Sequence, residues 1–326
     1  MKKNKIWIIL ILILIVSFIL GIIFGGVLIS LKDVIKGLFS TNDKYSIIMK
    51  NIRLPRVLGC MVAGIGLSIA GVLLQNVTNN SLASPNIIGV NSGAGLFVIC
   101  LLSFIPNIFY ALPVVAFFGA FVTTLLIIAI SSKIGSSKIT ILLSGMIITT
   151  LLNAIISLIS LLNTDALISY NYFSIGGLNG LSYEKLVIPL IFVVIALFFS
   201  VIFSKDIEVL ALGNEMAISL GVNVKRIRII ALILSSIAAS AVVSFAGLLG
   251  FVGLIVPHMA RKIVGNNTRK SLFASALIGS SLVILADLIG RVIIAPSEIP
   301  VGIIMALIGA PFFLVLLLNG GRYAKN

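Results

Sequence analysis

The sequence has little charge for its length. Asp, Glu, Lys and Arg make up 10% of its 326 residues, hydrophobic residues make up 60%, and the mean hydropathy is +1.27. About a quarter of the residues of a soluble domain are charged, so this chain lacks the charge to cover a water-facing surface. The composition predicts an all-α polytopic membrane protein in which residues 1–326 form a single transmembrane domain.

Histidine and cysteine are also scarce. The single histidine, His258, excludes a His-rich metal cluster, and Cys60 and Cys100 lie in apolar runs without a metal or redox motif. There is no Gly-Lys dipeptide, hence no phosphate-binding loop of the G-x-x-x-x-G-K-[ST] type, and no Ser/His/Asp arrangement is evident. We therefore expect no metal, no cofactor and no enzymatic activity in this chain.

Basic residues outnumber acidic ones by 23 to nine, which gives a net charge of +14. Such a charge can indicate nucleic-acid binding, but here the basic residues form short clusters between apolar runs. That placement is typical of membrane boundaries. We expect a lipid membrane and no nucleic acid as the partner of these charges.

Long uncharged runs predict about ten membrane-spanning helices, since one crossing needs about 20 residues. Lys2, Lys3 and Lys5 precede 25 uncharged residues, 6–30, a run too long for a signal peptide, which predicts a retained first helix. The other expected spans are three within residues 57–132, divided by breaks at 75–86 and 103–113, then 139–164, 186–204, a helix from 229 to about 246 with a short broken one after it, 272–294 and 299–318.

Ten spans place both termini on one side of the membrane. With the N-terminus inside, 15 of the 23 basic residues lie on the cytoplasmic side and eight outside, in agreement with the positive-inside rule. Six of those eight fall in residues 31–56, among them Arg53 and Arg56. This one segment runs against the rule.

Ionisable groups are missing from the centres of the first eight expected spans, where ion-coupled carriers usually have them. Asp287 is the one candidate, and it precedes Arg291 by four residues, so we expect an i,i+4 ion pair on one helix face. A chain that transports actively without its own energy source needs a partner that supplies energy.

The longest cytoplasmic segment, residues 205–228, is too polar to span and predicts short helices. Its E-M-A-I-S-L-G stretch places Glu215, Ala217 and Gly221 at the spacing of the coupling-loop motif of bacterial ATP-driven importers. A short helix with small residues can lie in a groove of a separate ATPase, and the glycine lets the chain turn back. By itself the pattern is common in helices.

Seven motifs in order carry a wider resemblance. They are RLPR at 53–56, SLASPNIIGVNSGAG at 81–95, YFSIGGLNG at 172–180, LGNEMAISLGV at 212–222, GFVGLIVPHMAR at 250–261, DLIGR at 287–291 and SEIPVGIIMALIGAPFFLVLL at 297–317. In these the chain resembles the FecCD-like permease subunits of type II ABC importers for iron-siderophore, haem and cobalamin. One departure is Ser81, where the family usually has proline.

The resemblance implies a type II ABC importer permease fold of ten helices in the cell membrane with both termini cytoplasmic. It implies a second permease subunit, identical or similar, with the translocation path between the two, two ATP-binding subunits, and an extracellular substrate-binding protein that we expect to be a lipoprotein. Iron-siderophore is the expected cargo, and haem and cobalamin stay open. In another class, an ion-coupled secondary transporter is the alternative.

The resemblance also assigns residues. It implies coupling to the ATPase by Gly213, Glu215, Ala217, Leu220, Gly221 and Val222, docking of the binding protein at Arg53, Arg56 and Arg291, and a cytoplasmic gate at Lys138, Ile139 and Thr140. Arginine suits docking because its planar fork binds a carboxylate through two nitrogens.

Overall fold

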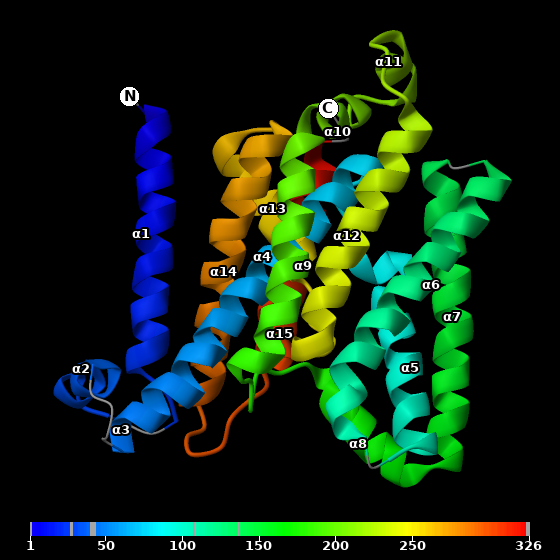
Figure 1. Cartoon of the computed structure of the whole chain (residues 1–326). Helices are drawn as coiled ribbons and strands as arrows, with labels where there is room; N and C mark the ends of the chain where they lie inside the picture. Colours follow the sequence, from blue (N-terminus) through cyan, green and yellow to red (C-terminus); the bar gives the residue numbers. More distant parts are fainter. Residues whose placement is uncertain (1, 27–28, 40–43, 107, 136, 324–326) are drawn as a thin grey trace.

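The computed structural model describes residues 2–26, 29–39, 44–106, 108–135 and 137–323 (Figure 1), and these are helical without a strand. The α-helices in chain order are α1 Lys2–Ile23, α2 Leu31–Phe39, α3 Lys44–Ile47, α4 Leu54–Thr78, α5 Val90–Phe104, α6 Leu112–Ile134, α7 Lys138–Leu162, α8 Thr164–Ile175, α9 Tyr183–Ile202, α10 Ser204–Leu210, α11 Asn214–Ser219, α12 Val224–Ala246, α13 Val252–Val264, α14 Thr268–Val292 and α15 Val301–Tyr323. A π-helix, Ile48–Arg53, leads into α4, and 3-10 turns at Pro85–Ile88 and Phe109–Ala111 precede α5 and α6.

The multi-pass helical architecture agrees with the sequence prediction, but the count of about ten spans is not confirmed. Within the described ranges, seven helices are long and apolar enough to cross a membrane, and two shorter apolar helices, Val90–Phe104 and Val301–Val315, accompany them. The shortening has a local cause. After α4 the chain uses residues 79–89 for a turn and a 3-10 helix, so that α5 has only 15 residues.

The break expected after residue 246 is present, because α12 ends at Ala246 and α13 begins at Val252. Gly247 has a φ of +69°, and a β-carbon there would overlap the carbonyl oxygen of Phe173, at the end of α8. The N–H of Gly177 also donates to the carbonyl of Ala246 at 2.9 Å. The end of α8, a helix that the sequence reading missed, therefore packs into the break.

The molecule has two distinct ends (Figure 1). The beginning of α1, the segment α10–α11 and the end of α15 lie at one end, which we call the α11 end. α2, α3, α8 and the connection from α14 to α15 lie at the opposite end, the α2 end. The first and last described helical turns thus share an end, as the predicted topology requires; Met1 and residues 324–326, including Lys325, are outside the described residues.

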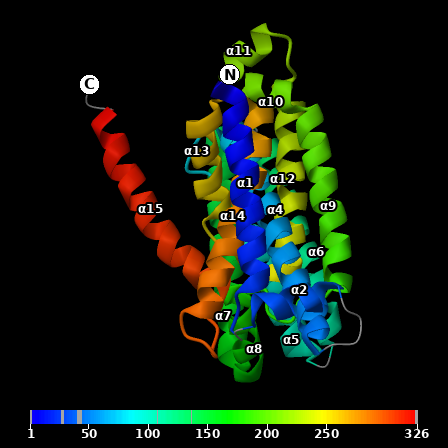
Figure 2. The same ribbon diagram turned by 90° about the vertical axis from the view of Figure 1, so that its left-hand side faces the viewer.

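The core is centred on α4, which packs against α14, α12 and α13. The backbones of α4 and α14 touch at Gly64 and Gly279, where a β-carbon on Gly64 would overlap the carbonyl of Gly279. Small residues allow this close approach between helices in lipid. By contrast, α15 diverges from the bundle (Figure 2), and its Leu307, Leu314 and Leu318 are exposed.

Candidate functional site

The predicted coupling residues surround α11, which projects beyond the bundle at the α11 end (Figure 1). Gly213 precedes α11 with φ +115° and Gly221 follows it with φ +79°, and a β-carbon on either would meet no atom within 4 Å. The N–H of Val222 donates to the carbonyl of Ala217 and that of Gly221 to Ile218, both at 2.9 Å. This pair of bonds is a Schellman motif, so the turn predicted at Gly221 is present.

The surface of α11 is apolar on its outer side. Ala217 is fully buried beneath it, whereas Met216, Ile218 and Leu220 are 54%, 65% and 59% exposed, and Glu215 is exposed beside them. A protruding helix with an apolar surface and one carboxylate is typical of a protein interaction site.

Two polar contacts fix the base of this segment. The carboxylate of Glu208, on α10, accepts hydrogen bonds from the N–H of Thr268 at 2.9 Å and from Nδ2 of Asn267 at 3.0 Å. It therefore lies at the N-terminus of α14, where the helix dipole favours a negative charge. Arg228, on α12, donates to Oδ1 of Asn214 at 2.8 Å. α10 is thus bound to α14, and α11 is bound to α12.

The residues of the predicted gate form the first turn of α7. Ser137 caps this turn, since its hydroxyl accepts a hydrogen bond from the N–H of Thr140 at 3.0 Å. Ile139 is 68% exposed, and Lys138 and Thr140 are half-buried. These residues lie at the α11 end, and their role as a gate stays a prediction.

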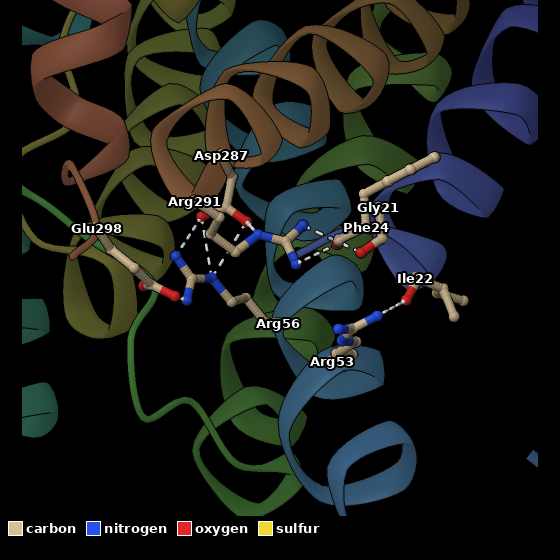
Figure 3. A network of polar contacts seen from close by, with 8 residues as sticks. All are labelled: Gly21, Ile22, Phe24, Arg53, Arg56, Asp287, Arg291 and Glu298. Carbon is tan, nitrogen blue, oxygen red and sulfur yellow. Dashed lines mark hydrogen bonds and ion pairs between the residues drawn. The ribbon is translucent and has the colours of Figure 1, made fainter. Parts of the chain in front are cut away.

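At the α2 end the structure brings the three predicted docking arginines together (Figure 3). Arg56 donates to Asp287 from Nη2 at 2.8 Å and from Nε at 3.0 Å, and its Nη1 donates to Glu298 at 2.7 Å. Nε of Arg291 lies 2.9 Å from Oδ2 of Asp287, which confirms the expected i,i+4 ion pair. We call these residues, with Arg53, the arginine network.

Two arginines of the network bind the end of α1. Arg291 donates to the carbonyls of Phe24 at 3.1 Å and Gly21 at 3.0 Å, and Arg53 donates to that of Ile22 at 2.8 Å (Figure 3). The last carbonyls of a helix have no partner inside the helix, and its C-terminal dipole attracts positive charge. The two arginines give these carbonyls hydrogen-bond donors and place positive charge at the C-terminus of α1.

The guanidinium groups of the network face inward. Arg53, Arg56 and Arg291 are 4%, 7% and 3% exposed, whereas the side chain of Glu298 is 27% exposed. The sequence predicted that the three arginines lie at one end, but it did not predict their contacts with Glu298 and the α1 carbonyls. The carboxylate of Glu298 in the SEIP stretch is the sequence feature that could have indicated a partner for Arg56. The docking role itself is untested by a single chain and stays a prediction.

A cavity of about 440 Å³ opens near the α2 end, beside the break between α12 and α13. Its lining is mainly apolar and aromatic, with a few uncharged polar groups: Leu102, Phe109, Leu112, Ser169, Tyr172, Phe173, Gly177, Asn179, Phe245, Ala246, Gly247 and Pro300. Such a lining can contact a large ligand without fixing one charge pattern.

Comparisons with known proteins point in the same direction. The model of the FecCD transport family matches residues 13–319. The Fe(3+)-citrate import system permease protein YfmD of Bacillus subtilis strain 168 is 38% identical over 98% of this chain and 96% of its own length. The cobalamin import system permease protein BtuC of Halobacterium salinarum is 37% identical over 86% of this chain and 75% of its own length. A solved structure described as an inward-facing conformation of a metal-chelate type ABC transporter has a TM-score of 0.87 at 29% identity, and the match covers 97% of this chain and 99% of that chain.

Proposed function

Because the chain belongs to the FecCD transport family, we propose that it is the membrane-spanning permease subunit of an ATP-driven importer of iron-siderophore complexes. The observation that supports an ATP-driven mechanism is the exposed apolar surface of α11, a short helix flanked by Gly213 and Gly221. This surface would bind a separate ATP-binding subunit, two of which serve two permease subunits. The α11 end then faces the cytoplasm, and both chain termini lie there.

The second permease subunit, identical or similar, would pack against the divergent helix α15. The exposed leucines of α15 and the position of this helix away from the bundle (Figure 2) support such an arrangement. The translocation path would then run between the subunits, and the cavity at the α2 end would be part of its outer entrance.

Iron-siderophore is the proposed cargo, with haem and cobalamin as alternatives within the same class. The relatives carry names for iron citrate and for cobalamin, and an aromatic, uncharged cavity lining is compatible with any of these large ligands. Selection of the cargo would belong to the extracellular binding protein. An ion-coupled carrier is disfavoured because the carboxylate of Asp287 is paired with both Arg56 and Arg291 and is not free to bind a transported ion.

Among the three arginines, Arg56 is the one best placed to receive a carboxylate of the binding protein. Its Nη1 is bound by Glu298, whose side chain is partly exposed and can be displaced, whereas Arg53 and Arg291 face α1. We expect Glu298→Gln to speed docking of the binding protein, because it removes the competing charge without disturbing Asp287. An unchanged docking rate and salt dependence would show that Arg56 serves only the fold.

The function is tested by uptake of labelled iron chelates into cells that contain this chain as their only permease of this type. Uptake through an ATP-driven importer stops with vanadate, whereas uptake by an ion-coupled carrier stops with an uncoupler alone. A panel of iron-siderophore, haem and cobalamin then identifies the cargo, and binding of each by the extracellular protein checks the result.

A further inference from the structure

We propose that Asn79 is a positioning residue that passes movement of the α10–α11 segment to the start of α7. The inference rests on the proposed function, since it assigns a route between the ATPase contact and the predicted gate. The geometry that points to it is a junction of three segments far apart in the sequence, which meet at a single amide side chain at the α11 end.

The amide of Asn79 binds two of these segments at once. With the side chain oriented so that both of its groups are satisfied, its nitrogen donates to the carbonyl of Ala211 at 3.2 Å and its oxygen accepts from Nζ of Lys138 at 3.2 Å. Ala211 is the residue that ends α10, and Lys138 begins α7. One side chain therefore bridges the end of α10 and the first turn of α7.

The backbone of Asn79 is firmly held. Asn79 ends α4 in the left-handed region, with φ 46° and ψ 41°, a conformation that asparagine tolerates better than most residues. Just before it, Gln75 donates from Nε2 to the carbonyl of Leu254 at 3.3 Å and accepts a hydrogen bond from Arg261. Because α4 is also packed against α14, the backbone at Asn79 is held in place relative to the bundle.

The two partners of Asn79 lie beside the segments that the proposal connects, α11 and the predicted gate. Ala211 stands two residues before Gly213, the glycine with a φ of +115° that directly precedes α11. Lys138 is followed directly by Ile139 and Thr140 of the predicted gate. A shift of α11 that moves the carbonyl of Ala211 acts on Asn79, and through it on Lys138.

Two variants of Asn79 and one control test the bridge. Asn79→Gly keeps the left-handed backbone and removes both bonds. Asn79→Asp keeps an acceptor for Lys138 but sets a carboxylate oxygen against the carbonyl of Ala211. Asn80→Ala is the control, because the side chain of Asn80 accepts a hydrogen bond within its own turn, from the N–H of Leu82 at 2.9 Å.

The measurement is the number of cargo molecules imported per ATP hydrolysed by the whole transporter in proteoliposomes. We expect this ratio to fall about fivefold in Asn79→Asp, which loses one hydrogen bond, to fall further in Asn79→Gly, which loses both, and to stay unchanged in Asn80→Ala. Lys138→Met should lower it too, and combining it with Asn79→Gly should add little, because both remove the same link.

A wild-type ratio in both Asn79 variants overturns the inference and leaves the proposed function standing. The inference is also overturned, and the proposed function still stands, if the effects of Asn79→Gly and Lys138→Met on the ratio add fully in the double variant. Absence of ATP-dependent uptake by the unmodified transporter would instead refute the proposed function. If Asn79→Gly does not reach the membrane, Asn79→Asp gives the answer, because it retains the volume and the turn preference of asparagine.

Discussion

Neutralising Asp287 should destabilise the chain far more than neutralising Glu298, although both carboxylates bind Arg56. Asp287 is 1% exposed and lies between two guanidiniums that are themselves nearly inaccessible. Removing one partner of a buried ion pair costs about 3–5 kcal/mol, because the other charge is left uncompensated. Asp287→Asn leaves two such charges facing a neutral amide.

Glu298 makes one contact and is 27% exposed, so that water can replace it. We expect Glu298→Gln to cost about 1 kcal/mol. For a large chain, 1 kcal/mol corresponds to about 2 °C in the unfolding temperature, which gives a loss of about 6–10 °C for Asp287→Asn and about 2 °C for Glu298→Gln. Glu184→Gln, an exposed carboxylate at the start of α9, should change nothing.

The chain carries its own reporter for this measurement. Cys60 is fully buried one helical turn after Arg56, and Cys100 is the other thiol. In a Cys100→Ser background, a dye that fluoresces on reaction with thiols reports the temperature at which Cys60 becomes accessible in detergent. Equal losses for Asp287→Asn and Glu298→Gln would refute the reasoning, since burial would then not set the strength of these pairs.

Three further predictions concern separate parts of the chain. Gly221→Val should abolish ATPase binding and uptake, whereas Gly180→Val, an equally unhindered glycine with φ +66° near the α2 end, should retain ATPase binding in a pull-down. Cysteine at Ile139 should crosslink across a permease dimer in at least one nucleotide state, and failure in every state would count against the gate. Arg291→Lys should speed hydrogen exchange in residues 20–26, because one ammonium cannot reach Asp287 and the carbonyls of both Gly21 and Phe24; exposed Arg226→Lys is the control.

The sequence predicts features that depend on neighbours along the chain. Runs of apolar residues locate most spans, the glycines after Ala246 locate the break, and four-residue spacing pairs Asp287 with Arg291. The turn at Gly221 also follows from local chemistry, since a left-handed residue after a short helix favours glycine. Each of these follows from one helix or one turn.

The features missed depend on contacts between distant segments. α8 begins with Thr164 and Asp165 and carries little apolar periodicity, and it is held by the break near Gly247 instead. The carbonyls that Arg53 binds at the end of α1 lie about 30 residues earlier and are main-chain groups without a side-chain signature. Asn79 is an ordinary residue in the sequence, and its two partners follow 59 and 132 positions later.

The arginine network also explains why Arg53 and Arg56 lie in a segment that, in the expected topology, runs against the positive-inside rule. That rule concerns charges that must remain in water beside the membrane. Arg56 and Arg291 are bound by Asp287 and Glu298, and Arg53 and Arg291 neutralise the carbonyl end of α1, so these charges are compensated inside the protein. These arginines therefore lie where α1, α4 and α14 are joined. Replacing Arg53, Arg56 or Arg291 by lysine would keep the positive charge but lose the hydrogen bonds that join these helices.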